Sequence, residues 1–272
     1  MSGEERPPHA VLVRSPEDFS APAVAKVLAE RAKVPALDMI PVVRKGWGVA
    51  AESLPAAQAE ALAAALTAAG QEALAVPTGL LEEVPPPVSA TKTAFTAPAF
   101  ELLAGRGNVP PESFAWPRLA LICAAAVEVR QSATATETTG PAMGEQVVRL
   151  GLTMATGIPL MKKKTEVKRT VETRDRRLFL DLVFTGPARR VRVDAAEFDY
   201  SVLGPRKGYG AELNFIALLE DLTSRAPKAL SGRGTRALLG RRSSSESLYE
   251  SFEDLAREER WLLSLAALRP AA

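Results

Sequence analysis

The chain has 272 residues, of which 47% are hydrophobic and 24% charged, and its formal net charge is +2. This composition is typical of a folded globular protein and argues against collagen-like, wholly disordered and membrane-spanning classes. One histidine and one cysteine are more restrictive. His9 lies near the N-terminus and Cys123 lies in an apolar run. The sequence therefore excludes internal disulfides, Cys/His zinc sites and histidine-based triads.

The N-terminal residues include Glu4, Glu5 and Arg6 and have no apolar core of the kind that secretory signals carry. The apolar run Leu119–Val127 is far shorter than the roughly 20 residues that a membrane helix needs. We therefore expect a cytoplasmic protein without an integral membrane segment.

Residues 10–77 alternate between strand and helix patterns. Ser20 is a suitable N-cap for a first helix, and Gly70 fits the residue that ends a second, alanine-rich helix. Lys45-Gly46 between two apolar runs predicts a hairpin turn. The predicted elements are a strand at Ala10–Arg14, a helix from Ser20 to about Lys33, strands at Met39–Arg44 and Trp47–Glu52, a helix at Pro55–Ala69 and a strand at Gln71–Val76. This βαββαβ order predicts a ferredoxin-like domain.

Proline content, strand patterns and charge divide the rest of the chain. Several strand patterns precede a helix pattern at Ala211–Arg225, and a last amphipathic pattern contains Trp261. We expect this C-terminal helix to pack on its own chain, with partner binding as the alternative. The predicted parts are a disordered tail (1–9), the ferredoxin-like domain (10–77), a Pro-rich linker (78–92), a second domain (93–225) with a mobile insertion around 131–176, a basic loop (226–245) and the C-terminal amphipathic helix (246–268).

Part of the second domain resembles a known family. The stretches Trp116-Pro-Arg-Leu-Ala-Leu-Ile and Leu178-Phe-Leu-Asp-Leu-Val, followed by a strand and a helix, resemble bacterial pleckstrin-homology-like (PH-like) domains. The phrase Phe198-Asp-Tyr-Ser-Val-Leu-Gly with Asn214-Phe215 also resembles a family of uncharacterised bacterial proteins. This resemblance covers residues 94–225 and implies an α+β chain whose second domain is an antiparallel roll with C-terminal helices. It implies a binding scaffold and no functional residues.

Charge is unevenly distributed, which suggests separate modules. Residues 1–90 have 7 basic and 11 acidic side chains, whereas residues 149–210 have 14 basic and 7 acidic ones. The segment Lys162–Arg177 holds eight cations and three acids. It could be a solvated edge strand protected by lysines, or it could face phospholipid headgroups or nucleic acid phosphates. Nucleic acid is the least favoured because no aromatic residue lies between Trp116 and Phe179 to stack on bases.

A second candidate anion site is the glycine-rich stretch before the helix at Ala211–Arg225. Backbone N–H groups at a helix N-terminus, next to two cations, can bind an anion, although a flexible turn is the favoured interpretation of this stretch. The candidate anion-binding residues of the chain are Lys162, Lys163, Lys164, Lys168, Arg169, Arg206, Lys207, Gly208 and Gly210.

No catalytic constellation is visible in the sequence. Asp194, Glu197 and Asp199 follow a predicted strand and could hold a hard cation, but turn capping is the simpler interpretation. Cys123 is expected to be a small core residue because no partner is available to activate its thiol. We therefore expect a non-enzymatic cytoplasmic protein-interaction or regulatory module that needs no cofactor or metal. The alternatives are a binder of anionic membrane or nucleic acid through residues 162–177, and an enzyme that uses carboxylate, Lys or Tyr chemistry.

Overall fold

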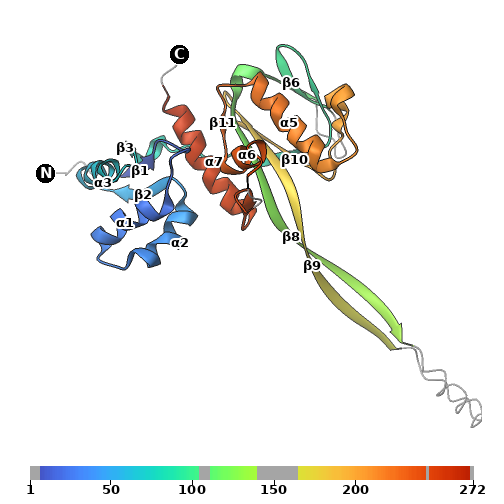
Figure 1. The fold of residues 1–272 in the computed structure, drawn as a ribbon, viewed down its shortest axis with the longest axis horizontal. Helices are drawn as coiled ribbons and strands as arrows, with labels where there is room; N and C mark the ends of the chain where they lie inside the picture. The colour runs from blue at the N-terminus through green and yellow to red at the C-terminus, as the bar shows by residue number, and fades with distance from the viewer. Residues whose placement is uncertain (1–6, 104–110, 140–164, 243–244, 270–272) are drawn as a thin grey trace, which may run out of the picture. The chain divides into compact units, whose positions relative to one another are not determined.

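The computed structural model describes residues 7–103, 111–139, 165–242 and 245–269, and the side chains of these residues except 130–174. It is an α+β structure with one small N-terminal sheet, one larger sheet and one further three-stranded sheet (Figure 1). Residues 1–127 and 177–272 form one compact unit, and residues 128–176 form another. Within the described residues, no helix has the combination of length and apolar character that crossing a membrane requires.

The N-terminal elements are β1 (His9–Val13), α1 (Ala21–Ala32), α2 (Ala36–Gly46), β2 (Val49–Leu54), α3 (Ala56–Ala68) and β3 (Ala73–Pro77). Strand β1 is central, with β2 and β3 paired antiparallel on either side. Its residues Ala10, Val11 and Leu12 are fully buried, as expected of an apolar central strand. Two predicted helix boundaries are confirmed: the Ser20 hydroxyl caps α1, and Gly70 has a positive φ of 80° after α3.

The predicted strand at Met39–Arg44 is wrong, because these residues belong to helix α2. Met39 and Ile40 are half-buried and Val43 is buried, which is the spacing of one helix face rather than strand alternation. Lys45 and Gly46 are the last residues of this helix and not a hairpin turn. The order is therefore βααβαβ, with three strands and three helices.

The larger sheet has the strand order β11-β8-β9-β10-β4, and β12 also pairs with β8. Its strands are β4 (Pro87–Ala90), β8 (Leu119–Thr139), β9 (Thr165–Phe184), β10 (Arg189–Asp194), β11 (Leu230–Ser231) and β12 (Leu248–Tyr249). The third sheet is β5 (Thr93–Phe95), β6 (Ala99–Leu102) and β7 (Glu112–Ala115), all antiparallel. The helices are η1 (Thr78–Leu80), η2 (Trp116–Arg118), η3 (Tyr200–Arg206), α5 (Ala211–Arg225), α6 (Arg233–Leu239) and α7 (Phe252–Ala267).

Some of the sequence predictions for the residues after β3 are confirmed, and others are wrong. Helix α5 has the predicted bounds, and the strand that was expected before Asp194, Glu197 and Asp199 is β10. Residues 131–139 were expected in a mobile insertion but lie in β8. The expected linker contains β4, which pairs parallel with β10, and the expected basic loop contains α6. Residues 140–164 of the expected insertion lie outside the described residues.

The main apolar core lies where the larger sheet, the third sheet and α5 meet. Phe184 of β9 stacks on Phe114 of β7 with ring centroids 4.4 Å apart. Leu218 and Leu222 of α5 are buried in the same cluster. Burial of such aromatic and leucine side chains is the main source of stability in this region.

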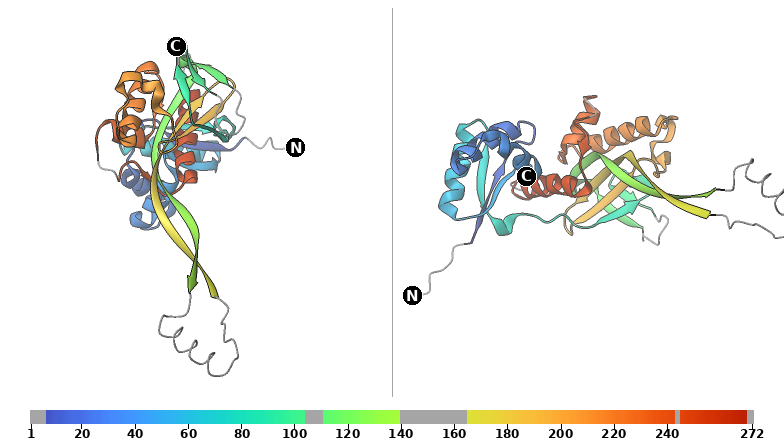
Figure 2. Two further views of the ribbon diagram at one scale, coloured as in Figure 1. Left: turned by 90° about the vertical axis from the view of Figure 1, so that its right-hand side faces the viewer. Right: turned by 90° about the horizontal axis from the view of Figure 1, so that it is seen from below.

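Helix α7 lies between the N-terminal sheet and the larger sheet (Figure 2). Trp261 of α7 is 1% exposed, and its Nε1–H donates to the Val13 carbonyl at 2.8 Å. The backbone of Gly48 approaches the Trp261 ring so closely that a Cβ at this position would lie 1.9 Å from it. The prediction that the C-terminal helix packs on its own chain is therefore confirmed.

Candidate functional site

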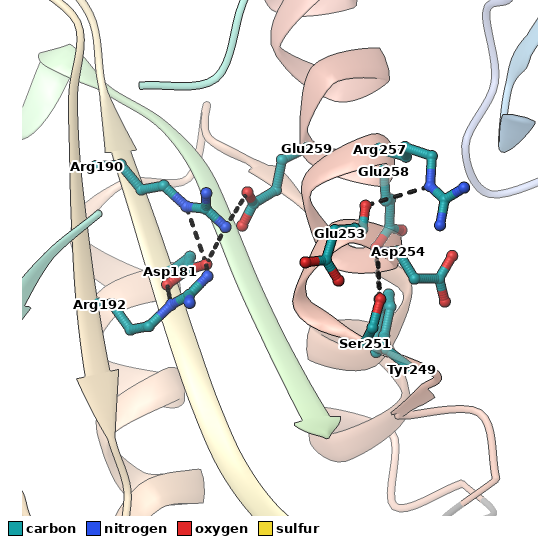
Figure 3. A network of polar contacts seen from close by, with 10 residues as sticks. All are labelled: Asp181, Arg190, Arg192, Tyr249, Ser251, Glu253, Asp254, Arg257, Glu258 and Glu259. Carbon is teal, nitrogen blue, oxygen red and sulfur yellow. Dashed lines mark hydrogen bonds and ion pairs between the residues drawn. The ribbon is translucent and has the colours of Figure 1, made fainter. Parts of the chain in front are cut away.

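Four charged side chains meet in the interior between helix α7 and strands β9 and β10 (Figure 3). Arg190 Nη2 lies 2.6 Å from Asp181 Oδ2 and 2.7 Å from Glu259 Oε2. Arg192 Nη2 also contacts Asp181 Oδ2, at 2.6 Å. The antiparallel register of β9 and β10 pairs Asp181 with Arg192 and places Arg190 two residues along the same face. We call Asp181, Arg190, Arg192 and Glu259 the ionic cluster.

The ionic cluster is removed from water, so its charges depend on one another. Asp181 and Glu259 have 0% side-chain exposure, and Arg190 has 6%. Burial raises the pKa of Glu259 well above its ordinary value, and the negative charge of Asp181 raises it further, whereas Arg190 lowers it. In the ionic cluster the two carboxyls of Asp181 and Glu259 face the two guanidinium groups of Arg190 and Arg192. The arrangement can bind α7 to the sheet, but it presents no group to a substrate.

A second buried carboxyl, Glu258, joins α7 to the start of α6. Its Oε1 accepts a hydrogen bond from the Arg233 backbone N–H at 2.7 Å, and its Oε2 accepts one from the Tyr249 hydroxyl. Burial raises the pKa of Glu258, although both hydrogen bonds act in the opposite direction. Burial and the neighbouring Glu258 also raise the pKa of Tyr249. This constellation therefore positions α6 and β12 and is closed to solvent.

Cys123 lies next to these carboxyls and is fully buried. Burial raises the pKa of its thiol, and the charges of Glu259 and Glu258 raise it further. Because the thiolate is the nucleophilic form, this environment disfavours reactivity. The prediction that Cys123 is a small core residue is confirmed.

The acids after β10 act as turn caps and ion-pair partners. Asp194 accepts a hydrogen bond from the Ala196 N–H at 3.0 Å, and Asp199 accepts one from the Ser201 N–H at 3.0 Å. Arg177 contacts both Asp194 and Glu197, at 2.5 and 2.9 Å. Among the residues that the structure describes, no group of three or more His, Cys, Asp or Glu side chains is placed to hold a metal ion.

The tyrosine of this segment is also engaged internally. The Tyr200 hydroxyl donates to the Ala195 carbonyl at 3.0 Å. Burial, with a smaller effect of Asp194, raises its pKa to about 12. A phenol that ionises only at so high a pH is poorly suited to act as a general base near neutral pH.

Two cavities in the described part of the chain are lined mainly by leucine, proline and alanine residues and not by the buried acids. One, of about 370 Å³, is lined by four leucines, one proline, Arg14 and Arg269. The other, of about 620 Å³, is lined by alanines, prolines, one leucine and Ser53. Neither combines a base, a nucleophile and a donor, which catalysis by acid–base or acyl transfer requires.

The glycine-rich candidate site has acidic neighbours. Arg206 pairs with Glu220 at 2.7 Å and also with Asp221, while Lys207 lies 3.8 Å from Asp199. Arg206 and Lys207 therefore already have carboxylate partners within the chain, and an anion would have to compete with these carboxylates.

The backbone of this stretch is partly engaged as well. The Gly208 N–H donates to Asn214 Oδ1 at 2.7 Å, and Gly210 is the N-cap residue of α5. An anion at this position would compete with the Asn214 side chain for the Gly208 donor.

The basic segment stays a prediction. Lys168 and Arg169 lie on β9, in the part where the structure describes the backbone only. Lys162, Lys163 and Lys164 lie outside the described residues. The structure places Lys168 and Arg169 on a strand. Binding of this segment to an anionic membrane or a nucleic acid stays a prediction from the sequence.

Several large apolar residues are exposed on and next to α2, and elsewhere in the described residues Leu80, Tyr209 and Leu213 are exposed as well. Leu37 is 78% exposed, Val42 57% and Val34 42%, although all three are large apolar residues. The opposite side of the helix faces the protein, where Val43 is 3% exposed. Exposed cations lie beside the apolar residues, and none of them forms an ion pair or a side-chain hydrogen bond with another described residue. We call this surface the α2 outer face; it consists of the apolar residues Val34, Leu37, Pro41 and Val42, the cations Lys33, Arg44 and Lys45, and the acid Asp38.

The sequence analysis predicted neither the buried acids of α7 nor the α2 outer face. The consecutive acids Glu258 and Glu259 lie in an amphipathic helix, where a surface position is the ordinary expectation. The nearby apolar residues Trp261 and Leu262 were the available signal that this part of α7 is largely buried. Val42 was assigned to a predicted strand and Leu37 lay just before it, so the two different sides of the helix were not recognised.

No known protein family, curated protein or solved structure matches the chain.

Proposed function

We propose that the chain is a non-enzymatic protein-interaction module of the cytoplasm, with a regulatory role, and that it binds its partner through the α2 outer face. The observation that carries this proposal is the exposure of Leu37 and Val42 on α2, a helix whose other side is packed, together with that of Val34 just before the helix. Clustered apolar side chains that remain in water are typical of a surface that is covered in a complex.

The buried polar residues support a non-enzymatic role. Glu258, Glu259 and Tyr249 are fully buried and contact groups of the chain itself. A catalytic acid or base has to reach its substrate directly or through one water. These groups instead connect helices and strands, which suits a rigid scaffold that presents a surface.

The PH-like likeness of residues 94–225 belongs to the same proposal. In its support, β9 and β10 pair antiparallel, and α5 follows them along the chain and packs in the common core. A scaffold of this kind would hold the N-terminal region through α7. The βααβαβ order of the N-terminal elements departs from a ferredoxin-like unit.

The test is a comparison of captured proteins between variants that fold alike. Purified full-length chain, its Leu37→Asp and Val42→Asp variants, and a Gln58→Asp control on the exposed side of α3 would be immobilised and exposed to lysate of the producing cells. We expect a defined protein that the unmodified chain and the control retain and both α2 variants lose. Equal retention by all four proteins would refute the role of this surface.

A further inference from the structure

We infer that the partner segment on the α2 outer face is an acidic amphipathic helix. This inference rests on the proposed function and adds the chemistry of the partner. The α2 outer face combines an apolar strip with cations at its edge, and each part selects for a different property of the occupant.

The apolar strip has the spacing that a helix needs to dock. Leu37 and Pro41 are four residues apart in α2 and therefore lie on one line of its exposed side. Val42 lies about 100° further round the helix than Pro41, with Lys45 and Asp38 between them. Helix α1 also packs against α2. Ridges of side chains on such a surface accept the apolar side of a third helix.

The cations set the charge of the occupant. Arg44 and Lys45 extend the strip at its C-terminal end, and Lys33 lies beside Val34 in the connection between α1 and α2. The segment 21–46 has five basic and two acidic residues, although residues 1–90 as a whole have 7 and 11. Cations that have no carboxylate partner in the described part of the chain would pair with acids of a partner.

An anionic membrane is the competing occupant, because basic amphipathic helices also bind lipid surfaces. One feature disfavours it: the α2 outer face has no aromatic residue, whereas Trp and Phe are typical of helices that insert into the interface. Asp38 is exposed on the same side of α2, between Leu37 and Val42 in angular position, and either anionic occupant has to keep its own negative charges away from this carboxylate.

The inference can be tested with two synthetic peptides and the full-length chain. Each peptide is a helix of about 18 residues, long enough to be partly helical in water, with leucines at three- and four-residue spacing. One has glutamate on both sides of the leucine row, and the other has lysine at the same positions. Binding is measured by fluorescence anisotropy at about 0.05 M and about 0.5 M salt, because screening weakens exposed charge pairs.

We expect the glutamate peptide to bind at least about tenfold more tightly than the lysine peptide, which corresponds to about 1.4 kcal/mol. The Arg44→Glu/Lys45→Glu variant should reverse this preference, Leu37→Asp should lose binding of both peptides, and Gln58→Asp should bind like the unmodified chain. The preference should shrink at the higher salt concentration.

Three results would overturn the inference. These are equal affinity for the two peptides, an unchanged preference in the Arg44→Glu/Lys45→Glu variant, and Leu37-dependent sedimentation with phosphatidylserine vesicles in place of peptide binding. Its failure is distinguishable from failure of the proposed function. If the α2 variants lose a captured protein whose contacting segment is not acidic, only the inference fails; if they lose nothing, the proposed function fails.

Discussion

Helices α7 and α2 distribute polar and apolar residues in opposite ways. Helix α7 buries Glu258 and Glu259, whereas α2 exposes Leu37 and Val42 to water. The buried acids of α7 have partners inside the chain, and the exposed residues of α2 have none among the described residues. The comparison teaches that buried charge connects elements inside this protein, while in the proposed function the exposed apolar surface of α2 binds a partner. The predictions below separate these two uses.

The largest effect is expected from Arg190→Ala. This change removes the cation that joins Asp181 to Glu259, so buried carboxyls lose their partner. We expect the free energy of unfolding to fall by about 3–5 kcal/mol. Urea unfolding would measure the loss, with Arg206→Ala as control: its ion pairs are about half exposed, and it should cost less than about 1 kcal/mol. Similar losses in both variants would contradict a special role of the ionic cluster.

A smaller effect is expected from Gly48→Ala, which tests the contact between the N-terminal region and α7. The added Cβ would overlap the buried Trp261 ring, which is held by its hydrogen bond to Val13. We expect a loss of about 1–3 kcal/mol, as is typical of overpacking, together with a changed Trp fluorescence. The matched control is Gly46→Ala, where nothing lies within 4 Å of the added atom. If the two variants unfold at the same urea concentration, Gly48 does not contact α7 as described.

Glu259→Gln should change how stability depends on pH. Because burial raises the folded-state pKa of Glu259, the stability that its protonated form contributes is present below the unfolded pKa and is lost as pH rises through the folded value. Glutamine cannot ionise, so the advantage of the variant should grow as pH rises. Urea midpoints between about pH 4 and pH 8, a range that spans the ordinary Glu pKa and neutrality, would show this.

Glu253→Gln is the control of opposite sign. Hydrogen bonding with Ser251 lowers the pKa of Glu253, so the stability that its ionised form contributes is present above the ordinary Glu pKa and is lost as pH falls through the lower folded value. The glutamine variant should therefore lose relative stability as pH rises toward the ordinary Glu pKa, and should change little above it. A glutamine variant at Glu259 that follows the same direction as the one at Glu253 would contradict a raised pKa for Glu259.

Leu37→Asp should have the smallest effect on stability and the largest on binding. Leu37 is 78% exposed, so its replacement should change the free energy of unfolding by no more than about 0.5 kcal/mol. Urea unfolding and anisotropy with the glutamate peptide would be measured on the same sample. A loss of several kcal/mol would mean that the side chain packs inside the protein, and the division between α7 and α2 would then be wrong.

The sequence was sufficient to predict an element where a local signal agreed with the tertiary structure. Helix α5 has a clear apolar face formed by Phe215, Leu218 and Leu222, and Ser20 and Gly70 mark helix ends by their side-chain chemistry and backbone freedom. These features are determined by residues close together in the chain, so periodicity and capping rules predict them.

The sequence was insufficient where long-range contacts decide. Residues 39–43 form a short apolar run, and such a run cannot be assigned to strand or helix from periodicity alone. Glu259 is buried only because Arg190, 69 residues earlier in the chain, lies opposite it. The α2 outer face became visible only after the burial of Val43 showed which side of the helix faces the protein.

Site-specific photo-cross-linking at Leu37 tests the central claim most directly. A photoreactive amino acid would be placed at Leu37, and in a second sample at the exposed control Gln58, in the cells that produce the protein. We predict a discrete cross-linked protein from Leu37 and none from Gln58, because in the proposed function the partner lies on the α2 outer face and not on α3. Absence of a specific product from Leu37, or the same products from both positions, would contradict the claim that this surface binds a protein.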